Sequence, residues 1–385
     1  MAAAGRCYRI ILSSTNALPA TMRVGFVVNP IAGMGGSVGL KGTDGDEILR
    51  EAVSRGARRT SPMRASEALK GLNAAGFEFI TCAGEMGQEE LEEAGISYRV
   101  VFVPREHTDR RDTVDAVEAF VREVASMILF AGGDGTARDI LAVVDKRVPQ
   151  IGIPTGVKMQ SGVFANTPAD VAHLLYSFAE SGLTKEAEVM DVDEESYRNG
   201  VLQARLYGYA LVPDDAPHMQ SSKTVYHSGS ADEEAEELGQ YIAETMERGV
   251  AYILGPGSTT AAVTRALGQE KTLLGVDVLI DGRTVVGDAS EDGLLDLLGR
   301  RRDARIVVTP IGAQGFFLGR GNQQISPDVV KAVGPANVIV IATPTKLMHT
   351  PVLRVDTGDP SLDAAFRGTI KVVTGYRRRK LVPVI

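Results

Sequence analysis

The chain has 385 residues, of which 44% are hydrophobic and 23% are charged, a composition typical of a globular protein long enough for two domains. Its formal net charge of −8 disfavours nucleic acid as a main partner, and its two cysteines, Cys7 and Cys82, exclude a disulfide scaffold and a cysteine-built zinc site. No segment approaches the roughly 20 apolar residues of a membrane span, so we expect a cytoplasmic protein with no membrane partner.

The first strong element begins at Met22. Residues 1–21 are predicted to be an N-terminal extension, and Met22 is a candidate for the natural start. Residues 22–29 are apolar enough for a buried strand, which runs directly into the turn Asn29-Pro30-Ile31-Ala32-Gly33-Met34-Gly35-Gly36. A strand that ends in a glycine-rich turn opens many α/β nucleotide-binding domains.

Strands and helices then alternate as far as residue 182. Apolar residues at helical spacing predict helices over 113–124 and 137–144, and Thr167-Pro168-Ala169-Asp170 predicts a further helix start. The predicted strands are 22–29, 77–81, 98–103, 127–131 and 148–153. This alternation predicts an α/β fold, with a Rossmann-like parallel sheet covered by helices on both faces, for a nucleotide-binding domain over residues 22–182.

Residues 183–367 are predicted to form a second, substrate-binding domain of α/β or β-rich type. It opens with polar, irregular sequence that contains one strand over 201–212, and an acidic amphipathic helix over 232–248 follows. The later predicted elements are strands over 250–254, 272–280, 305–309 and 338–342 and helices over 291–299 and 327–333. Residues 368–385 are a candidate closing strand that returns to the first domain.

The sharpest chemical signal is Gly132-Gly133-Asp134-Gly135-Thr136, directly after the apolar strand. In open α/β sheets, ligands collect at the carboxyl ends of the strands. Glycines let the backbone approach phosphate oxygens, and the amides at the start of the next helix favour an anion. An aspartate at such a place can take a proton from a hydroxyl group or help to hold Mg²⁺. The alternative is a tight strand–helix turn in which Asp134 only caps the helix.

The ordered set of motifs resembles the superfamily of NAD kinases and diacylglycerol kinases. Gly132–Thr136 is similar to the signature loop of these enzymes, and Asn29–Gly33 is similar to their first-strand motif. Gly257-Ser258-Thr259 resembles part of a glycine-containing segment of NAD kinases, and Val308–Gly315 resembles the AcoX-like branch in particular. The chain is therefore most similar to the predicted ATP-NAD kinase family of archaea and bacteria.

This resemblance implies a kinase that moves a phosphoryl group from ATP, or from polyphosphate, to the 2′-hydroxyl of the adenosine ribose of NAD, which gives NADP. Asp134 is the expected catalytic residue, with Mg²⁺ or another divalent cation nearby whose ligands the sequence does not identify. Lys158, in a glycine turn at the same sheet edge, is a candidate cation for the phosphates, with a solvated loop lysine as the alternative. The other residues expected to bind the nucleotides are Asn29, Gly33, Gly132, Gly133, Gly135, Thr136, Gly257, Ser258 and Thr259.

The substrate side departs from the family pattern in two ways. The chain has no Asn-Glu dipeptide, which in NAD kinases helps to hold the dinucleotide, and Thr260 and Ala261 follow Thr259 where a tyrosine is expected. Two alternatives therefore stay open: a nucleotide-binding accessory or sensor protein without kinase activity, and a kinase of a different small hydroxyl substrate. Because NAD kinases are usually oligomers, the resemblance also implies a homo-oligomer. Gly319–Gln324 is predicted to be a surface turn rather than a ligand rim.

Overall fold

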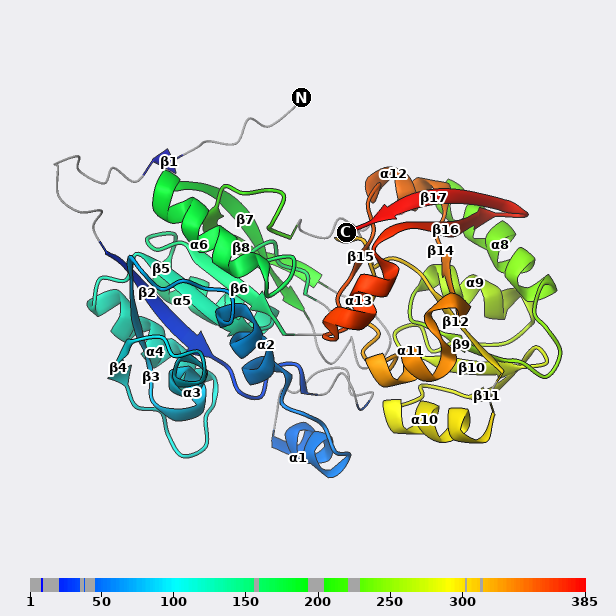
Figure 1. Cartoon of the computed structure of the whole chain (residues 1–385), viewed down its shortest axis with the longest axis horizontal. Coiled ribbons are helices and arrows are strands. Elements are labelled where there is room, and N and C mark those ends of the chain that lie inside the picture. The colour runs from blue at the N-terminus through cyan, green and yellow to red at the C-terminus, as the bar shows by residue number, and fades with distance from the viewer. Residues whose placement is uncertain are drawn as a thin grey trace. The chain divides into compact units, whose positions relative to one another are not determined.

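In a computed structural model of the chain, the described residues are 8–9, 21–34, 38, 46–155, 159–192, 204–220, 229–301, 303–311 and 314–385. The chain divides into two compact units, each with its own sheet and hydrophobic core (Figure 1). The first unit comprises Met1–Met34, Arg58–Glu194 and Leu202–Ser222. The second comprises Gly35–Ala57, Glu195–Val201 and Lys223–Ile385.

A parallel sheet in the order β4-β3-β2-β5-β6 forms the centre of the first unit, as predicted. Its strands are β2 (Met22–Val28), β3 (Phe77–Cys82), β4 (Tyr98–Phe102), β5 (Met127–Gly132) and β6 (Gln150–Pro154). The chain builds the sheet outward from β2 through β3 to β4, and then returns to the other side of β2 with β5 and β6. The strand order therefore reverses between β2 and β5, the place where doubly wound sheets bind ligands.

Helices cover both faces of this sheet because each carries an apolar stripe. On one face α4 packs against α5, and on the other α2 packs against α3 and α6 (Figure 1). These helices are α2 (Thr60–Leu69), α3 (Gln88–Glu93), α4 (Arg110–Arg122), α5 (Asp134–Val144) and α6 (Asp170–Ser181), and a 3-10 turn, η2 (Gly84–Met86), precedes α3. Asp109 and Asp112 form a capping box that begins α4 three residues before the predicted position.

An antiparallel hairpin of β7 (Leu183–Val192) and β8 (Ala204–Pro213) packs against α5 and belongs to the first unit. The short strand β1 (Tyr8–Arg9), from the predicted N-terminal extension, pairs with β7. The sequence predicts β8 but not β7, because charged side chains in Leu183–Val192 obscure its alternating pattern. The first unit therefore extends past the predicted boundary at residue 182.

The second unit is also built on an α/β sheet, with the strand order β11-β10-β9-β12-β14-β16-β17. The four central strands β9, β12, β14 and β16 are parallel, and the outer three are antiparallel to their neighbours. The strands are β9 (Ala251–Leu254), β10 (Asp277–Ile280), β11 (Arg283–Val286), β12 (Ala304–Val308), β14 (Val338–Ile341), β16 (Gly368–Gly375) and β17 (Arg378–Val384). The alternating sequence pattern after residue 250 predicts this architecture.

Two further groups of helices enclose the second sheet. On one face α8 and α9 pack together over one apolar cluster, and α10 packs against α11 over another. The helices of this unit are α1 (Asp46–Ser54), α8 (Gly229–Glu244), α9 (Ser258–Ala266), α10 (Glu291–Arg300), α11 (Pro327–Val333), α12 (Pro344–His349) and α13 (Pro360–Phe366). The remaining elements are the small sheet of β13 (Phe316–Leu318) and β15 (Arg354–Val355) and the 3-10 turn η4 (Pro335–Asn337).

The end of the chain does not return to the first sheet. Instead β16 pairs with β14, and β17 pairs with β16 at the edge of the second sheet, which corrects the candidate closing strand at residues 368–385. Val372, Val382 and Val384 are buried in the core of the second unit, so this placement satisfies the apolar residues of both strands. Within the described part of the chain, no helix has the length and apolar character needed to cross a membrane.

Candidate functional site

The loop Gly132–Thr136 lies at the carboxyl end of β5, beside the end of β2, where the strand order of the first sheet reverses. Gly133 is the N-cap of α5 and offers no side chain to cap the first amides of the helix. An uncapped helix start at a sheet's carboxyl edge is suited to an anion such as a phosphate group.

The glycines of this loop serve two different purposes. A Cβ atom at Gly132 would lie 2.5 Å from Thr136 Oγ1, so close packing against α5 requires glycine there. Apart from its chain neighbours and its own helix backbone, a Cβ atom at Gly133 or Gly135 would meet no described residue within 4 Å, and neither residue has a positive φ. Since neither packing nor backbone strain requires glycine at positions 133 and 135, the open space beside them fits the close approach of a ligand.

The Asp134 side chain is buried and accepts hydrogen bonds from the segment that follows β6. Oδ1 accepts from Ser161 N at 2.9 Å and from Ser161 Oγ at 2.5 Å, and Oδ2 accepts from Gln160 N at 2.8 Å. A carboxylate, which only accepts hydrogen bonds, matches this set of donors. Asp134 is the first residue of α5 rather than its N-cap, and its oxygens accept from residues 26 and 27 positions later in the chain.

Asn29 and Gly33 from the first-strand turn lie against the same loop region. Asn29 Nδ2 donates to Thr136 Oγ1 at 3.1 Å, and Asn29 N donates to Ala131 O at 2.9 Å. Gly33 has a φ of +79°, and a Cβ atom there would lie 2.2 Å from Thr155 O at the end of β6. The structure therefore brings together Asn29, Gly33 and Gly132–Thr136, whereas Lys158 lies outside the described residues.

The remaining predicted residues, Gly257, Ser258 and Thr259, begin α9 at the carboxyl end of β9 in the second unit. Gly257 is the N-cap of α9, with a φ of +124° and no side-chain cap. Ser258 is exposed, whereas the buried Thr259 Oγ1 accepts a hydrogen bond from Lys346 Nζ at 3.2 Å. The second unit therefore has the same strand–glycine–helix arrangement as the loop at Asp134 in the first unit.

Family models match both units of the chain. The model of the ATP-NAD kinase N-terminal domain matches residues 24–183, and that of the ATP-NAD kinase C-terminal domain matches residues 248–384. The chain belongs to the ATP-NAD kinase family. A comparison with curated proteins finds no match. Membership of this family supports a kinase that phosphorylates NAD to NADP with ATP as the phosphoryl donor.

Sequence reasoning missed two polar residues of this ATP-NAD kinase chain that lie beside Thr259. Lys346 Nζ donates hydrogen bonds both to Thr259 Oγ1 and to Thr309 Oγ1, the latter at 3.0 Å. Thr309 directly follows β12, and Lys346 lies in the first turn of α12, which follows β14. The sequence feature that could have identified Thr309 and Lys346 is a Thr-Pro pair directly or shortly after a buried strand, at Thr309-Pro310 and Thr343-Pro344.

Folding also brings together two histidines that are distant in the sequence. His173 Nε2 lies 3.0 Å from Asp215 Oδ2, His218 Nδ1 lies 2.7 Å from Asp215 Oδ1, and the two rings are 4.0 Å apart. Among the residues that the structure describes, these three form the one group with metal-ligating spacing. Because Asp215 pairs with both imidazoles, the arrangement is satisfied without an ion.

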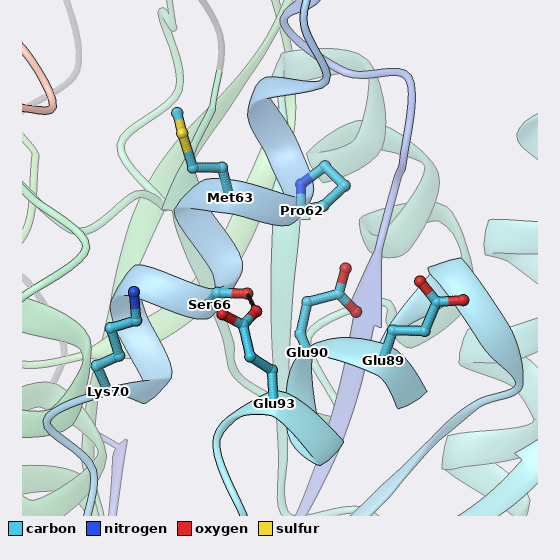
Figure 2. A pocket seen from close by; sticks show the side chains of 7 residues that line it. All are labelled: Pro62, Met63, Ser66, Lys70, Glu89, Glu90 and Glu93. Atoms are coloured by element: carbon cyan, nitrogen blue, oxygen red, sulfur yellow. Dashed lines mark hydrogen bonds between the residues drawn. The ribbon is translucent and has the colours of Figure 1, made fainter.

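A pocket lined by three glutamates lies between α2 and α3 of the first unit (Figure 2). Ser66 Oγ donates to Glu93 Oε2 at 2.6 Å, and the Glu90 carboxyl group points toward α2. Burial, together with the charges of Glu89, Glu93 and Glu85, raises the pKa of Glu90 to about 7. None of the predicted site residues lines this pocket.

The Glu90→Gln variant is expected to be more stable than the wild type at pH 9 and about equally stable at about pH 3.5, below the pKa of the unfolded carboxyl group. A raised pKa means that folding favours protonated Glu90. The free energy of unfolding of the wild type therefore falls by up to about 3 kcal/mol as the pH rises from below 4.5 through 7. Neutral glutamine avoids this loss. Urea unfolding of both proteins at each pH measures the difference. Glu89→Gln, which changes an exposed carboxylate of the same helix, is the matched control, and an equal gain in that variant would contradict the assignment to Glu90.

Proposed function

We propose that this member of the ATP-NAD kinase family transfers the γ-phosphoryl group of ATP to the 2′-hydroxyl of the adenosine ribose of NAD at the carboxyl edge of the first sheet. The observation that carries this assignment is the open space beside Gly133 and Gly135, which adjoins an uncapped helix start and the Asp134 carboxylate. The loop amides and the helix start hold phosphate oxygens, and Asp134 accepts the proton of the attacking hydroxyl.

In the proposed step the ribose oxygen forms a bond to the γ-phosphorus, the bond from that phosphorus to the bridging oxygen of ADP breaks, and the hydroxyl proton passes to Asp134. Phosphoryl transfer proceeds through a loose transition state, so the attacking hydroxyl needs orientation more than early deprotonation. Three donated hydrogen bonds hold the oxygens of Asp134 in place. This geometry therefore suits a carboxylate that orients the hydroxyl and takes its proton late.

The Asp134 carboxylate fits a divalent cation that is held mainly by the phosphates of ATP. Mg²⁺ in kinases is typically bound by one or two carboxylates together with substrate phosphates and water. Among the described residues, no group of three metal-ligating side chains includes Asp134. When bound, such an ion would neutralise phosphate charge, and Asp134 is the carboxylate that would hold it.

The test of this function is turnover by the wild-type protein. Purified protein with Mg²⁺, ATP and NAD is expected to form NADP, detected by an NADP-specific dehydrogenase. Replacing ATP by polyphosphate, and NAD by NADH or other small hydroxyl compounds, tests the alternative donor and acceptors. Nucleotide binding without any phosphoryl transfer would overturn the kinase assignment and favour the accessory or sensor alternative. The homo-oligomeric state and the cytoplasmic location of the sequence analysis stay predictions.

Replacing Gly135 by alanine is expected to lower kcat/KM for ATP by at least about 10-fold while leaving the protein as stable as the wild type or more so. Alanine stabilises a helix by roughly 0.5–1 kcal/mol relative to glycine. Apart from its chain neighbours and its own helix backbone, the new Cβ would meet no described residue within 4 Å, so we expect it to obstruct a ligand. Steady-state kinetics and thermal unfolding measure the two effects. Gly299→Ala, at an open position late in α10, is the control for the added methyl group. Unchanged kinetics in Gly135→Ala would argue against phosphate binding at this loop.

A further inference from the structure

The second unit gathers three polar side chains at the carboxyl ends of three adjacent parallel strands. Thr259 follows β9, Thr309 follows β12, and Lys346 follows β14, and the order β9-β12-β14 places these strands side by side. Lys346 Nζ lies 3.2 Å from Thr259 Oγ1 and 3.0 Å from Thr309 Oγ1. Both threonines are buried, so the ammonium group is held in one place at this sheet edge.

The charge of Lys346 is not balanced by a carboxylate among the described residues. Its two hydrogen-bond partners are neutral hydroxyl groups, and burial lowers the pKa of Lys346 to about 8. The nearby Glu234 of α8 is bonded instead to Thr345, through the backbone N at 3.1 Å and through Oγ1 at 3.0 Å. A shielded cation with only neutral partners is costly for the fold, and an anionic ligand would remove that cost.

Lys271, whose side chain is only 1% exposed, is a lysine of the same unit with a structural role. Lys271 Nζ lies 3.4 Å from Asp277 Oδ2 and donates to the carbonyl oxygens of Thr272 and Gly275. Its charge is therefore neutralised, and its donors are used, within a single loop. Among the described residues, Lys346 donates only to the two threonine hydroxyl groups, which separates it from Lys271.

The start of α9 lies next to this cluster. Gly257 leaves the first turn of α9 without a side-chain cap, and Thr260 Oγ1 bonds to the carbonyl oxygens of Gly255 and Gly257, which fixes the turn. Thr259, which bonds to Lys346, is the second residue of that helix. An ammonium group, two hydroxyl groups and the amides of a helix start that lacks a side-chain cap are the donors that a phosphate group accepts from.

We propose that Lys346, Thr259 and Thr309, with the start of α9, bind a phosphate group of a nucleotide in the second unit. The identity of the ligand as ATP or NAD rests on the proposed function, whereas the preference for a phosphate rests on the donors themselves. Lys346 is accordingly a binding residue that anchors a substrate phosphate. The shared chemistry of the two nucleotides is the phosphoanhydride group, and their separate titration identifies which one is held here.

The experiment is isothermal titration of the wild type and of Lys346→Met with ATP and with NAD at pH 7. Loss of a charge-assisted contact is expected to raise the Kd of at least one nucleotide by about 10- to 100-fold. If Lys346→Met raises the Kd of ATP alone, the site binds ATP, and if it raises the Kd of NAD alone, the site binds NAD. A higher Kd for both nucleotides assigns the site to the phosphoanhydride group that they share. Lys371→Met removes an exposed lysine of the same unit and is expected to bind both nucleotides like the wild type.

Unchanged affinity of Lys346→Met for both nucleotides would overturn the inference, as would a wild type that binds neither. Thermal unfolding monitors the fold of the variant, and Thr309→Val provides a second, shape-conserving change that should weaken the same nucleotide. Failure of the kinase assignment is distinguishable from failure of this inference, because binding that depends on Lys346 would persist in a protein that forms no NADP. A protein that forms NADP with wild-type kinetics after Lys346→Met would instead remove this site and leave the kinase assignment intact.

Discussion

The Asp134→Asn variant is expected to form NADP about 100- to 10,000-fold more slowly than the wild type, the range that removal of a positioned general base typically produces. Asparagine cannot take up the proton of the attacking hydroxyl, and its amide group would turn a donor toward Gln160 N or Ser161 N, where the carboxylate accepts. The fall should appear in kcat more than in the KM of either nucleotide, because the phosphate contacts come from the loop backbone. Initial rates at saturating ATP and NAD measure it.

Two control variants separate chemistry from structure in this experiment. Ser161→Ala removes the hydroxyl that donates to Asp134 Oδ1 but leaves the carboxylate, and we expect it to lower kcat by less than about 10-fold. Asp139→Asn changes a buried carboxylate of the same helix as Asp134. It weakens the ion pairs of Asp139 with Arg110 of α4 and Arg138 of α5 and should cost stability rather than turnover. NADP formation by Asp134→Asn at the rate of Asp139→Asn would show that Asp134 is only structural.

The hydrogen bonds around Asp134 also connect the loop to a distant part of the first unit. Ser161 Oγ donates to Asp134 Oδ1 and accepts from Met190 N of β7 at 2.9 Å. The β7–β8 hairpin therefore helps to hold the segment that positions the carboxylate. This link gives the hairpin a function at the site, although it does not belong to the parallel sheet.

The parallel sheet of the first unit could be predicted because each of its strands is a short apolar run and each connecting helix has a clear apolar stripe. The loop at Asp134 could also be predicted to lie at a strand end, since the apolar run before Gly132 and the helical spacing after Asp134 mark both borders. The order reversal between β2 and β5 follows from neither pattern. It depends on pairing between residues about 100 positions apart.

Other features could not be predicted from the sequence, because the partners of their polar residues are distant along the chain. Gly319–Gln324, predicted to be a surface turn, is instead largely buried, with Arg320 only 4% exposed and 3.1 Å from Asp356. The Thr343-Pro344 pair marks the strand end before Lys346, but the hydroxyl partners of Lys346 come from the ends of two other strands. Sequence spacing cannot reveal a cluster of this kind, because its members lie 37 or more residues apart.

Replacing Gly33 by alanine is expected to lower the free energy of unfolding by about 2–5 kcal/mol and to reduce nucleotide binding in the same variant. A side chain at a φ of +79° costs roughly 1 kcal/mol, and the new Cβ would lie 2.2 Å from the backbone oxygen of Thr155, so the first-strand turn must move away from β6. Asn29, which joins this turn to Thr136, would move with it. Denaturant unfolding and ATP titration measure the two losses.

The matched control for Gly33 is Gly56→Ala. Gly56 has nearly the same φ, +77°, but a Cβ atom there would meet nothing within 4 Å, so this variant isolates the cost of the backbone conformation. We expect Gly56→Ala to lose about 1 kcal/mol of stability and to bind ATP like the wild type. The difference between the two variants is then the cost of the contact with Thr155. If both variants lost the same stability and kept full affinity, the close approach of Gly33 to β6 would have no part in shaping the phosphate-binding edge.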